Sequence, residues 1–104
     1  MIDLNRLTVK ALENAQKRQE NGANIKTDTR SMIKHCATEV VETMEAYNGW
    51  SMLCDSKSHF ESELADIVCC VLIIAGQEQI DIEEAVLNCI EKNKKRAEGM
   101  GDKL

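Results

Sequence analysis

Two pairs of carboxylates are the residues in this chain whose types and spacing best support chemistry. The pairs are Glu39 with Glu42 in the segment EVVE, and Glu63 with Asp66 in the segment ELAD. Side chains at positions i and i+3 lie on one side of an α-helix, so each pair would concentrate negative charge there. A cation between the two pairs would relieve that repulsion. Carboxylate oxygens suit a hard divalent ion, which predicts Mg²⁺, with Mn²⁺ as a substitute.

An ion in such an acidic groove is a natural receiver for a polyphosphate. It would neutralise phosphate charge and lower the pKa of a bound water, which then becomes a nucleophile at neutral pH. The carboxylates are numerous enough to leave one as a general base. The alternative is that both pairs are solvated helix faces, and it stays open for either pair alone. Apolar neighbours such as Val40 and Leu64 place the pairs at the core boundary, where unpaired carboxylates are rare.

A basic cluster near the end of the chain could hold the phosphates. Lys92 and Arg96 share one face of an expected helix, with Asn93 beside them. Arginine can grip a phosphate with two hydrogen bonds. The alternative is that these cations only interact favourably with the helix dipole. Tyr47 or Trp50 could stack on a base, and for both the alternative is ordinary packing.

The elements that must position these residues are helices. Each segment between the glycines carries apolar residues at helical spacing, and none alternates as a strand would, which predicts an all-α, four-helix bundle-like fold. The expected helices cover about 3–20, 29–48, 59–75 and 82–98, and residues 50–57 form the expected loop.

The start of each helix should carry a capping residue. The expected caps are, in chain order, Asp3, Asp28 or Thr27, Ser58 with Glu61, and Asp81 with Glu84. From Ile67 onward the third helix is apolar on nearly every side, as a helix buried on all faces would be. Four short helices can scarcely surround it, so we expect this helix to form an oligomer interface.

Length, charge and cysteine content bound the class of protein. The 104 residues predict a single domain, 1–104, and the net charge of −5 argues against nucleic-acid binding. The longest apolar run, Ile67–Ala75, is shorter than the roughly 20 residues that span a membrane. No signal-peptide pattern opens the chain, and the five cysteines form no CxxC motif, which favours reduced thiols in the cytoplasm.

The order of these motifs supplies a resemblance. EVVE, then ELAD at the head of an apolar helix, then IDIEEAV and EKNKKR, together resemble the MazG-like all-α nucleoside triphosphate pyrophosphohydrolases over about residues 29–97. The resemblance implies a homodimer or homotetramer with its active site near the subunit interface. It also implies Mg²⁺-dependent hydrolysis of a nucleoside or deoxynucleoside triphosphate to the monophosphate and pyrophosphate, with a metal-bound water attacking the α-phosphorus.

The same resemblance implies roles for particular residues. The metal-binding carboxylates of that family match Glu39, Glu42, Glu63 and Asp66, and its phosphate- and nucleotide-contacting positions match Lys92, Asn93 and Arg96. The segment ATEVV also resembles phosphoribosyl-ATP pyrophosphohydrolase, a relative that would carry glutamate where Cys36 stands.

Two further classes remain open. His35 and His59 each lie four residues before an acidic pair, which suggests a carboxylate-bridged di-iron bundle. Ferritin-like sites instead place the histidine three residues after a glutamate, so the order disagrees. The other class is a non-catalytic helical interaction module, in which the apolar third helix would serve dimerisation alone.

Overall fold

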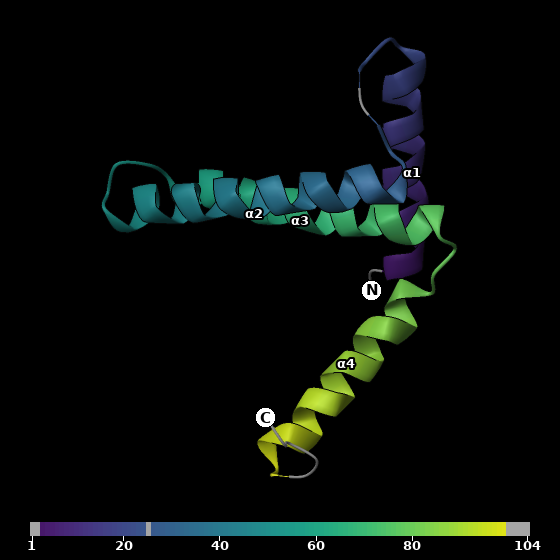
Figure 1. The fold of residues 1–104 in the computed structure, drawn as a ribbon. Coiled ribbons are helices and arrows are strands. Elements are labelled where there is room, and N and C mark those ends of the chain that lie inside the picture. Colours follow the sequence, from purple (N-terminus) through teal and green to yellow (C-terminus); the bar gives the residue numbers. More distant parts are fainter. Residues whose placement is uncertain (1–2, 25, 100–104) are drawn as a thin grey trace.

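Four helices make up the fold, and the predicted all-α class is confirmed. The computed structural model describes residues 3–24 and 26–99, and these ranges contain no strand. The helices are α1 (Leu4–Glu20), α2 (Thr29–Ser51), α3 (Lys57–Gln77) and α4 (Ile82–Ala97). Within the described chain α1 and α4 both lie at one end of a central pair, the end away from the α2–α3 turn, so the helices form an open cross and not a closed bundle (Figure 1).

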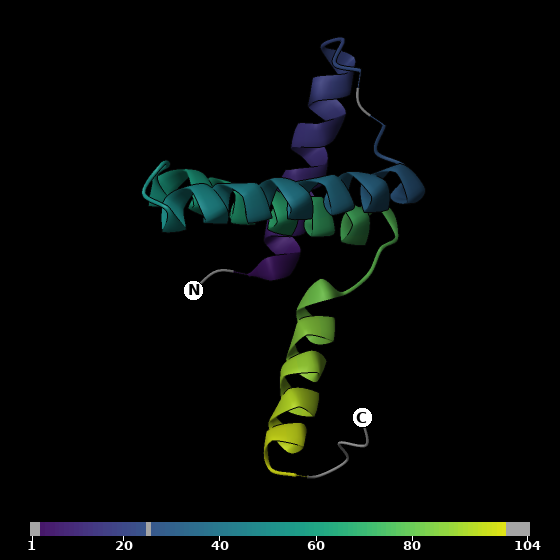
Figure 2. The same ribbon diagram turned by 60° about the vertical axis from the view of Figure 1, so that its left-hand side comes forward.

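The central pair is an antiparallel hairpin of α2 and α3 (Figures 1 and 2). Its buried side chains include Met32 and Ala46 from α2 and Cys70 from α3. The thiol of Cys70 donates a hydrogen bond to the backbone oxygen of Met32, at 3.2 Å. Burial raises the pKa of this thiol to about 11, so Cys70 acts as a small apolar side chain.

Helix α1 crosses the hairpin at a glycine. A Cβ atom on Gly76 would lie 3.1 Å from Cγ2 of Thr8 and 3.2 Å from Cδ2 of Leu12, so the missing side chain lets the two helices approach closely. The connection to α2 is tied down as well, because the amide of Gln77 donates a hydrogen bond to the backbone oxygen of Thr27. These contacts hold α1 against α3.

Helix α4 points away from the hairpin (Figure 2). It meets the start of α1, where Nδ2 of Asn5 donates to Oδ1 of Asp81 at 2.9 Å and the backbone N–H of Glu83 donates to Oδ1 of Asn5 at 3.3 Å. All described residues after Glu83 are exposed or only partly buried, so α4 is fixed at its first turn and free along the rest of its length.

Three of the four predicted caps are confirmed, namely Asp3, Asp28 and Asp81. The third was wrong: Ser56, not Ser58, caps α3, and its hydroxyl accepts the backbone N–H of His59 at 3.1 Å. The expected loop over 50–57 was also too long, because α2 continues through Ser51. A tight turn follows, in which Leu53 has φ 62° and the N–H of Cys54 donates to the oxygen of Gly49 at 2.8 Å.

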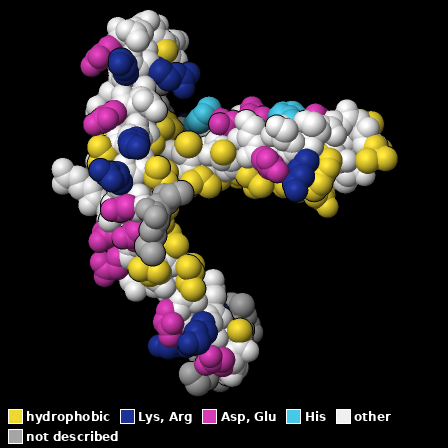
Figure 3. Space-filling view, turned by 180° about the vertical axis from the view of Figure 1, so that it is seen from behind, with side chains coloured by type: hydrophobic (Ala, Val, Ile, Leu, Met, Phe, Trp, Pro, Cys, Tyr) yellow, Lys and Arg dark blue, Asp and Glu magenta, His cyan; other side chains and the backbone are white. Residues whose placement is uncertain are grey.

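The two edges of the hairpin differ in character. One edge exposes apolar side chains, and we call it the apolar edge: Val40, Met44, Tyr47, Phe60, Leu64 and Ile67. Figure 3 shows hydrophobic side chains along one edge and histidine and acidic side chains along the other. In the described residues, no helix combines the length and the apolar character needed to cross a bilayer.

Candidate metal centre

The hairpin brings three of the four predicted carboxylates together. Glu39 from α2 and Glu63 and Asp66 from α3 each offer one carboxylate oxygen, and these atoms lie within 4.8 Å of one another. The antiparallel arrangement explains the convergence, because each residue lies mid-helix on the face turned toward the other helix. Glu42 stays exposed and lies beside Glu63 on the rim.

Two of these carboxylates are short of partners. Glu39 is 8% exposed, and the side chain of Glu63 is 16% exposed. In each of them Oε2 is buried and has no hydrogen-bond partner among the described residues. A buried oxygen without a partner is costly and rare. A divalent ion bound by these oxygens would satisfy both, so the donor set fits Mg²⁺.

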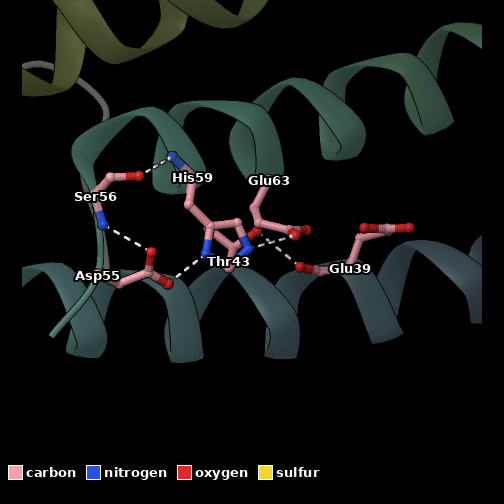
Figure 4. A network of polar contacts seen from close by, with 6 residues as sticks. All are labelled: Glu39, Thr43, Asp55, Ser56, His59 and Glu63. Atoms are coloured by element: carbon pink, nitrogen blue, oxygen red, sulfur yellow. Dashed lines mark hydrogen bonds and ion pairs between the residues drawn. The ribbon is translucent and has the colours of Figure 1, made fainter.

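Each buried glutamate is held by a histidine one turn earlier in its helix. The Nε2 atom of His35 lies 2.9 Å from Oε1 of Glu39, and the Nε2 atom of His59 lies 3.2 Å from Oε1 of Glu63. One oxygen of each carboxylate is therefore fixed and the other remains free for a ligand. Figure 4 shows this arrangement for Glu63 and His59. The histidines thus bind the carboxylates and do not join the acidic cluster, which disagrees with a ferritin-like arrangement.

A residue that sequence reasoning missed completes this arrangement. Asp55 Oδ2 lies 2.5 Å from Nδ1 of His59, so the imidazole is held between Asp55 and Glu63 (Figure 4). The backbone N–H of Ser56 donates to Oδ1 of Asp55 at 2.7 Å. The sequence spacing could have identified Asp55, because Asp55, His59 and Glu63 are four residues apart. The expected helix began at His59 and so placed Asp55 in a loop, where helical spacing does not apply.

The pKa values of Glu39 and His59 are both raised by their surroundings. Burial raises the pKa of Glu39, and the nearby charges of Glu42 and Asp66 raise it further, while His35 opposes the shift. The pKa of His59 is also raised, chiefly by its hydrogen bond to Asp55 and then by Glu63. Glu39 therefore resists ionisation unless a cation is present.

Two hollows open on either side of the acidic cluster. We call the first, of about 310 Å³, the His59 hollow; it is lined by Glu42, Glu45, Ala46, Asp55, His59 and Glu63. We call the second, of about 350 Å³, the His35 hollow; it is lined by Arg18, His35, Glu39, Asp66, Cys69, Cys70 and Ile73. Each hollow has acidic residues from both α2 and α3 and one histidine, and the His59 hollow is the more acidic of the two, with four acidic residues against two.

Comparison with protein families decides the assignment. The model of the MazG nucleotide pyrophosphohydrolase domain matches residues 27–100. The chain belongs to the MazG family. Comparisons with curated proteins and with solved structures gave no significant match. The MazG match includes the hairpin with its carboxylates and helix α4, whereas α1 precedes it.

The basic residues expected at the MazG site lie elsewhere in the chain. Lys92, Asn93 and Arg96 are exposed on α4, and α4 projects away from the carboxylates (Figure 1). Within the described residues, their only side-chain hydrogen bond runs from Nδ2 of Asn93 to Sγ of Cys89, at 3.7 Å within α4. One chain therefore does not bring these residues to the acidic cluster.

The expected base-stacking residue is packed against other rings. Trp50 lies in the last turns of α2 and stacks on Phe60, with ring centroids 5.6 Å apart and an interplanar angle of 22°. Tyr47 meets the edge of Trp50 at 6.2 Å, so the three rings form a small cluster at the tip of the hairpin. This geometry favours the packing role for Trp50.

Proposed function

We propose that this MazG-family protein is a Mg²⁺-dependent nucleoside triphosphate pyrophosphohydrolase that acts as a single domain in the cytoplasm. Its substrate would be a nucleoside or deoxynucleoside triphosphate, and its products the monophosphate and pyrophosphate. One observation carries the proposal: Glu39, Glu63 and Asp66 converge, and two of them keep a buried oxygen without a partner. Family membership supports nucleotide pyrophosphohydrolase chemistry in general.

The carboxylates would hold Mg²⁺ and prepare the attacking water. Glu39, Glu63 and Asp66 would be the ligands, and the bound ion would supply phosphate neutralisation and water activation. Glu42 lies on the exposed rim beside Glu63, where it can take the proton of the attacking water as general base. In this reaction the water oxygen bonds to the α-phosphorus, the bond to the bridging oxygen breaks, and pyrophosphate leaves with the electron pair.

His35 and His59 would orient the carboxylates of Glu39 and Glu63 for metal binding. Each holds Oε1 of a glutamate, so the free Oε2 atoms keep fixed directions toward the centre. Groups that hydrogen-bond a ligand from outside the metal's own shell typically strengthen metal binding in this way.

We further propose that the protein assembles as a homodimer or homotetramer. The apolar edge exposes 51% of Val40 and 59% of Met44, and contiguous exposed apolar patches on soluble proteins typically mark interaction surfaces. Since α4 points away from the carboxylates of its own chain, Lys92, Asn93 and Arg96 would reach a bound nucleotide only in the partner subunit's site.

A nucleotide screen tests the proposal. The purified protein is mixed with common ribo- and deoxyribonucleoside triphosphates and Mg²⁺, and both monophosphate and pyrophosphate are quantified. We expect equal amounts of the two products from at least one substrate, no products with chelator, and none from Glu39→Gln. Glu61→Gln is the control, because Glu61 is exposed on α3 and, in the described part of the chain, its carboxylate pairs only with Lys57. Release of inorganic phosphate in place of pyrophosphate would contradict the proposed reaction.

A further inference from the structure

Helix α1 makes the two halves of the metal centre unequal. Both hollows contain a histidine and acidic residues, four in the His59 hollow and two in the His35 hollow. Among the described residues, only the His35 hollow has a wall from α1, and that wall contains Arg18. The residues of α1 precede the part of the chain that matches the MazG model, so the family match does not describe this wall.

The His35 hollow adjoins a second space. Arg18, His35 and Ile73 line both the His35 hollow and a neighbouring cavity of about 400 Å³. The other residues that line the cavity are Ala15, Asn24, Lys26, Thr27, Ser31 and Met32. Figure 3 shows the corner between α1 and the hairpin, with basic side chains on the α1 side and a histidine on the hairpin side. Glu39 and Asp66 therefore lie beside a corner that contains the basic side chains of Arg18 and Lys26.

The charge of Arg18 is available to a ligand. Its side chain is exposed and forms no ion pair within the described residues, although acidic residues line the same hollow. A free anion would be repelled by Glu39 and Asp66, so an anion bound here must bring a cation with it. A polyphosphate chelated to Mg²⁺ meets this condition, and the planar guanidinium matches phosphate oxygens with two hydrogen bonds.

We propose that Arg18 is a substrate-binding residue that takes the β- and γ-phosphates of the nucleotide, the part that leaves as pyrophosphate. This inference rests on the proposed function. It also specifies on which side of the site the water attacks and on which side pyrophosphate leaves. Glu42, the proposed base, lies in the His59 hollow, whereas Arg18 lies in the His35 hollow on the other side of the cluster. Water would attack from the Glu42 side, and the electron pair of the broken bond would leave with pyrophosphate toward Arg18, as an in-line displacement requires.

The test compares Arg18→Gln with Lys17→Gln, a variant with the same charge change at the neighbouring residue, which lines neither space. Binding of inorganic pyrophosphate with Mg²⁺ is measured by calorimetry, together with KM and kcat for the best nucleotide. We expect Arg18→Gln to weaken pyrophosphate binding and raise KM by about ten- to a hundredfold, the scale of a hydrogen bond to a charged group. Lys17→Gln should bind pyrophosphate as the wild type does. Arg18→Lys keeps the positive charge but loses the two parallel hydrogen bonds of the guanidinium, so its affinity should lie between those of the wild type and Arg18→Gln.

The outcomes separate this inference from the proposed function. Mn²⁺ affinity without nucleotide should be unchanged or tighter in Arg18→Gln, because a nearby cation has been removed; weaker Mn²⁺ binding would show a structural role and overturn the inference. Pyrophosphate affinities that agree among Arg18→Gln, Arg18→Lys and the wild type would also overturn it. If the wild type hydrolyses no nucleotide but its pyrophosphate binding depends on Arg18, the proposed function fails, and only the role of Arg18 in binding a polyphosphate stands. Circular dichroism confirms that each variant is folded.

Discussion

The Nε2 atom of His59 lies 3.2 Å from Oε1 of Glu63, and the other oxygen of that carboxylate is buried and free of hydrogen bonds within the described chain. We expect His59→Ala to weaken Mn²⁺ binding by about ten- to a hundredfold, the usual cost of losing a group that orients a metal ligand. Electron paramagnetic resonance of free Mn²⁺ measures the affinity. Ser62→Ala, an exposed change on the same helix, is the control. Equal affinities in the two variants would show that His59 does not orient Glu63.

The crowding of carboxylates around Glu39 predicts a stability change whose sign depends on metal. Because the pKa of Glu39 is raised, its ionisation costs stability in the folded state: this cost is absent below the ordinary range of a glutamate and appears as pH rises through the raised pKa. Metal-free Glu39→Gln should therefore melt above the wild type at neutral pH, and the difference should shrink as the pH falls toward acid.

Added Mg²⁺ should reverse that order. The wild type gains stability by binding the ion, whereas Glu39→Gln lacks one ligand and gains less. Thermal melts with chelator and with Mg²⁺ measure both effects. A metal-free Glu39→Gln protein that melts below the wild type at neutral pH would show that Glu39 is not under electrostatic strain.

The turn of the hairpin predicts an effect of Gly49 on the distant metal centre. A Cβ atom at Gly49 would lie 2.9 Å from Cβ of Asp55, so Gly49→Ala forces Asp55, the partner of His59, to move. We expect a loss of about 1–3 kcal/mol in the free energy of unfolding, typical of overpacking, together with weaker Mn²⁺ binding. Ser51→Ala, at the same end of α2, serves as the control.

A second change separates the two effects of Gly49→Ala. Adding Asp55→Gly removes the Cβ atom that clashes, so part of the lost stability should return. Metal affinity should stay low, because His59 has still lost its partner. Full recovery of metal affinity in the double variant would contradict the role assigned to Asp55.

The exposed apolar edge predicts self-association. Met44 lies on that edge and Glu45 lines the His59 hollow, so neighbouring residues on α2 give matched substitutions. We expect Met44→Lys to convert a dimer or tetramer to a smaller species, measured by analytical ultracentrifugation, and Glu45→Lys to leave the assembly intact. A wild type that sediments as a monomer at micromolar concentration would refute this prediction.

The direction of α4 predicts that subunits share a site. Arg96→Gln and Glu39→Gln should each lower activity alone, but a mixture should recover part of it. In a mixed dimer, the intact Arg96 of one chain would serve the intact carboxylates of the other. Measured hydrolysis of the mixture equal to the sum of the separate variants would contradict sharing.

Local spacing was enough to predict the four helices and the meeting of Glu39, Glu63 and Asp66. Helical periodicity fixes which residues share a face, and a short connection turns one helix back on the other. The positions of Arg18 and Asp55 could not be predicted from spacing, because they depend on contacts between segments that are distant in the sequence. The α1 crossing at Gly76 places Arg18, and the turn after Gly49 places Asp55.

The basic cluster of Lys92, Asn93 and Arg96 is a second case in which sequence spacing could not predict a position in space. Lys92 and Arg96 do share the face of a helix, as their spacing predicted, but nothing in that spacing sets the direction of α4. That direction follows from Asn5, which ties the first turn of α4 to α1 through Asp81. Sequence spacing therefore identified the cluster without locating it.

His35, Glu39 and Glu42 on α2 have the same spacing as His59, Glu63 and Asp66 on α3. Because the two helices are antiparallel, this repeat gives each hollow a histidine, a carboxylate from α2 and a carboxylate from α3. A second ion would therefore find ligands of the same kind without additional residues. Helix α1 borders only the His35 hollow and Asp55 only the His59 hollow, so two bound ions would differ in affinity.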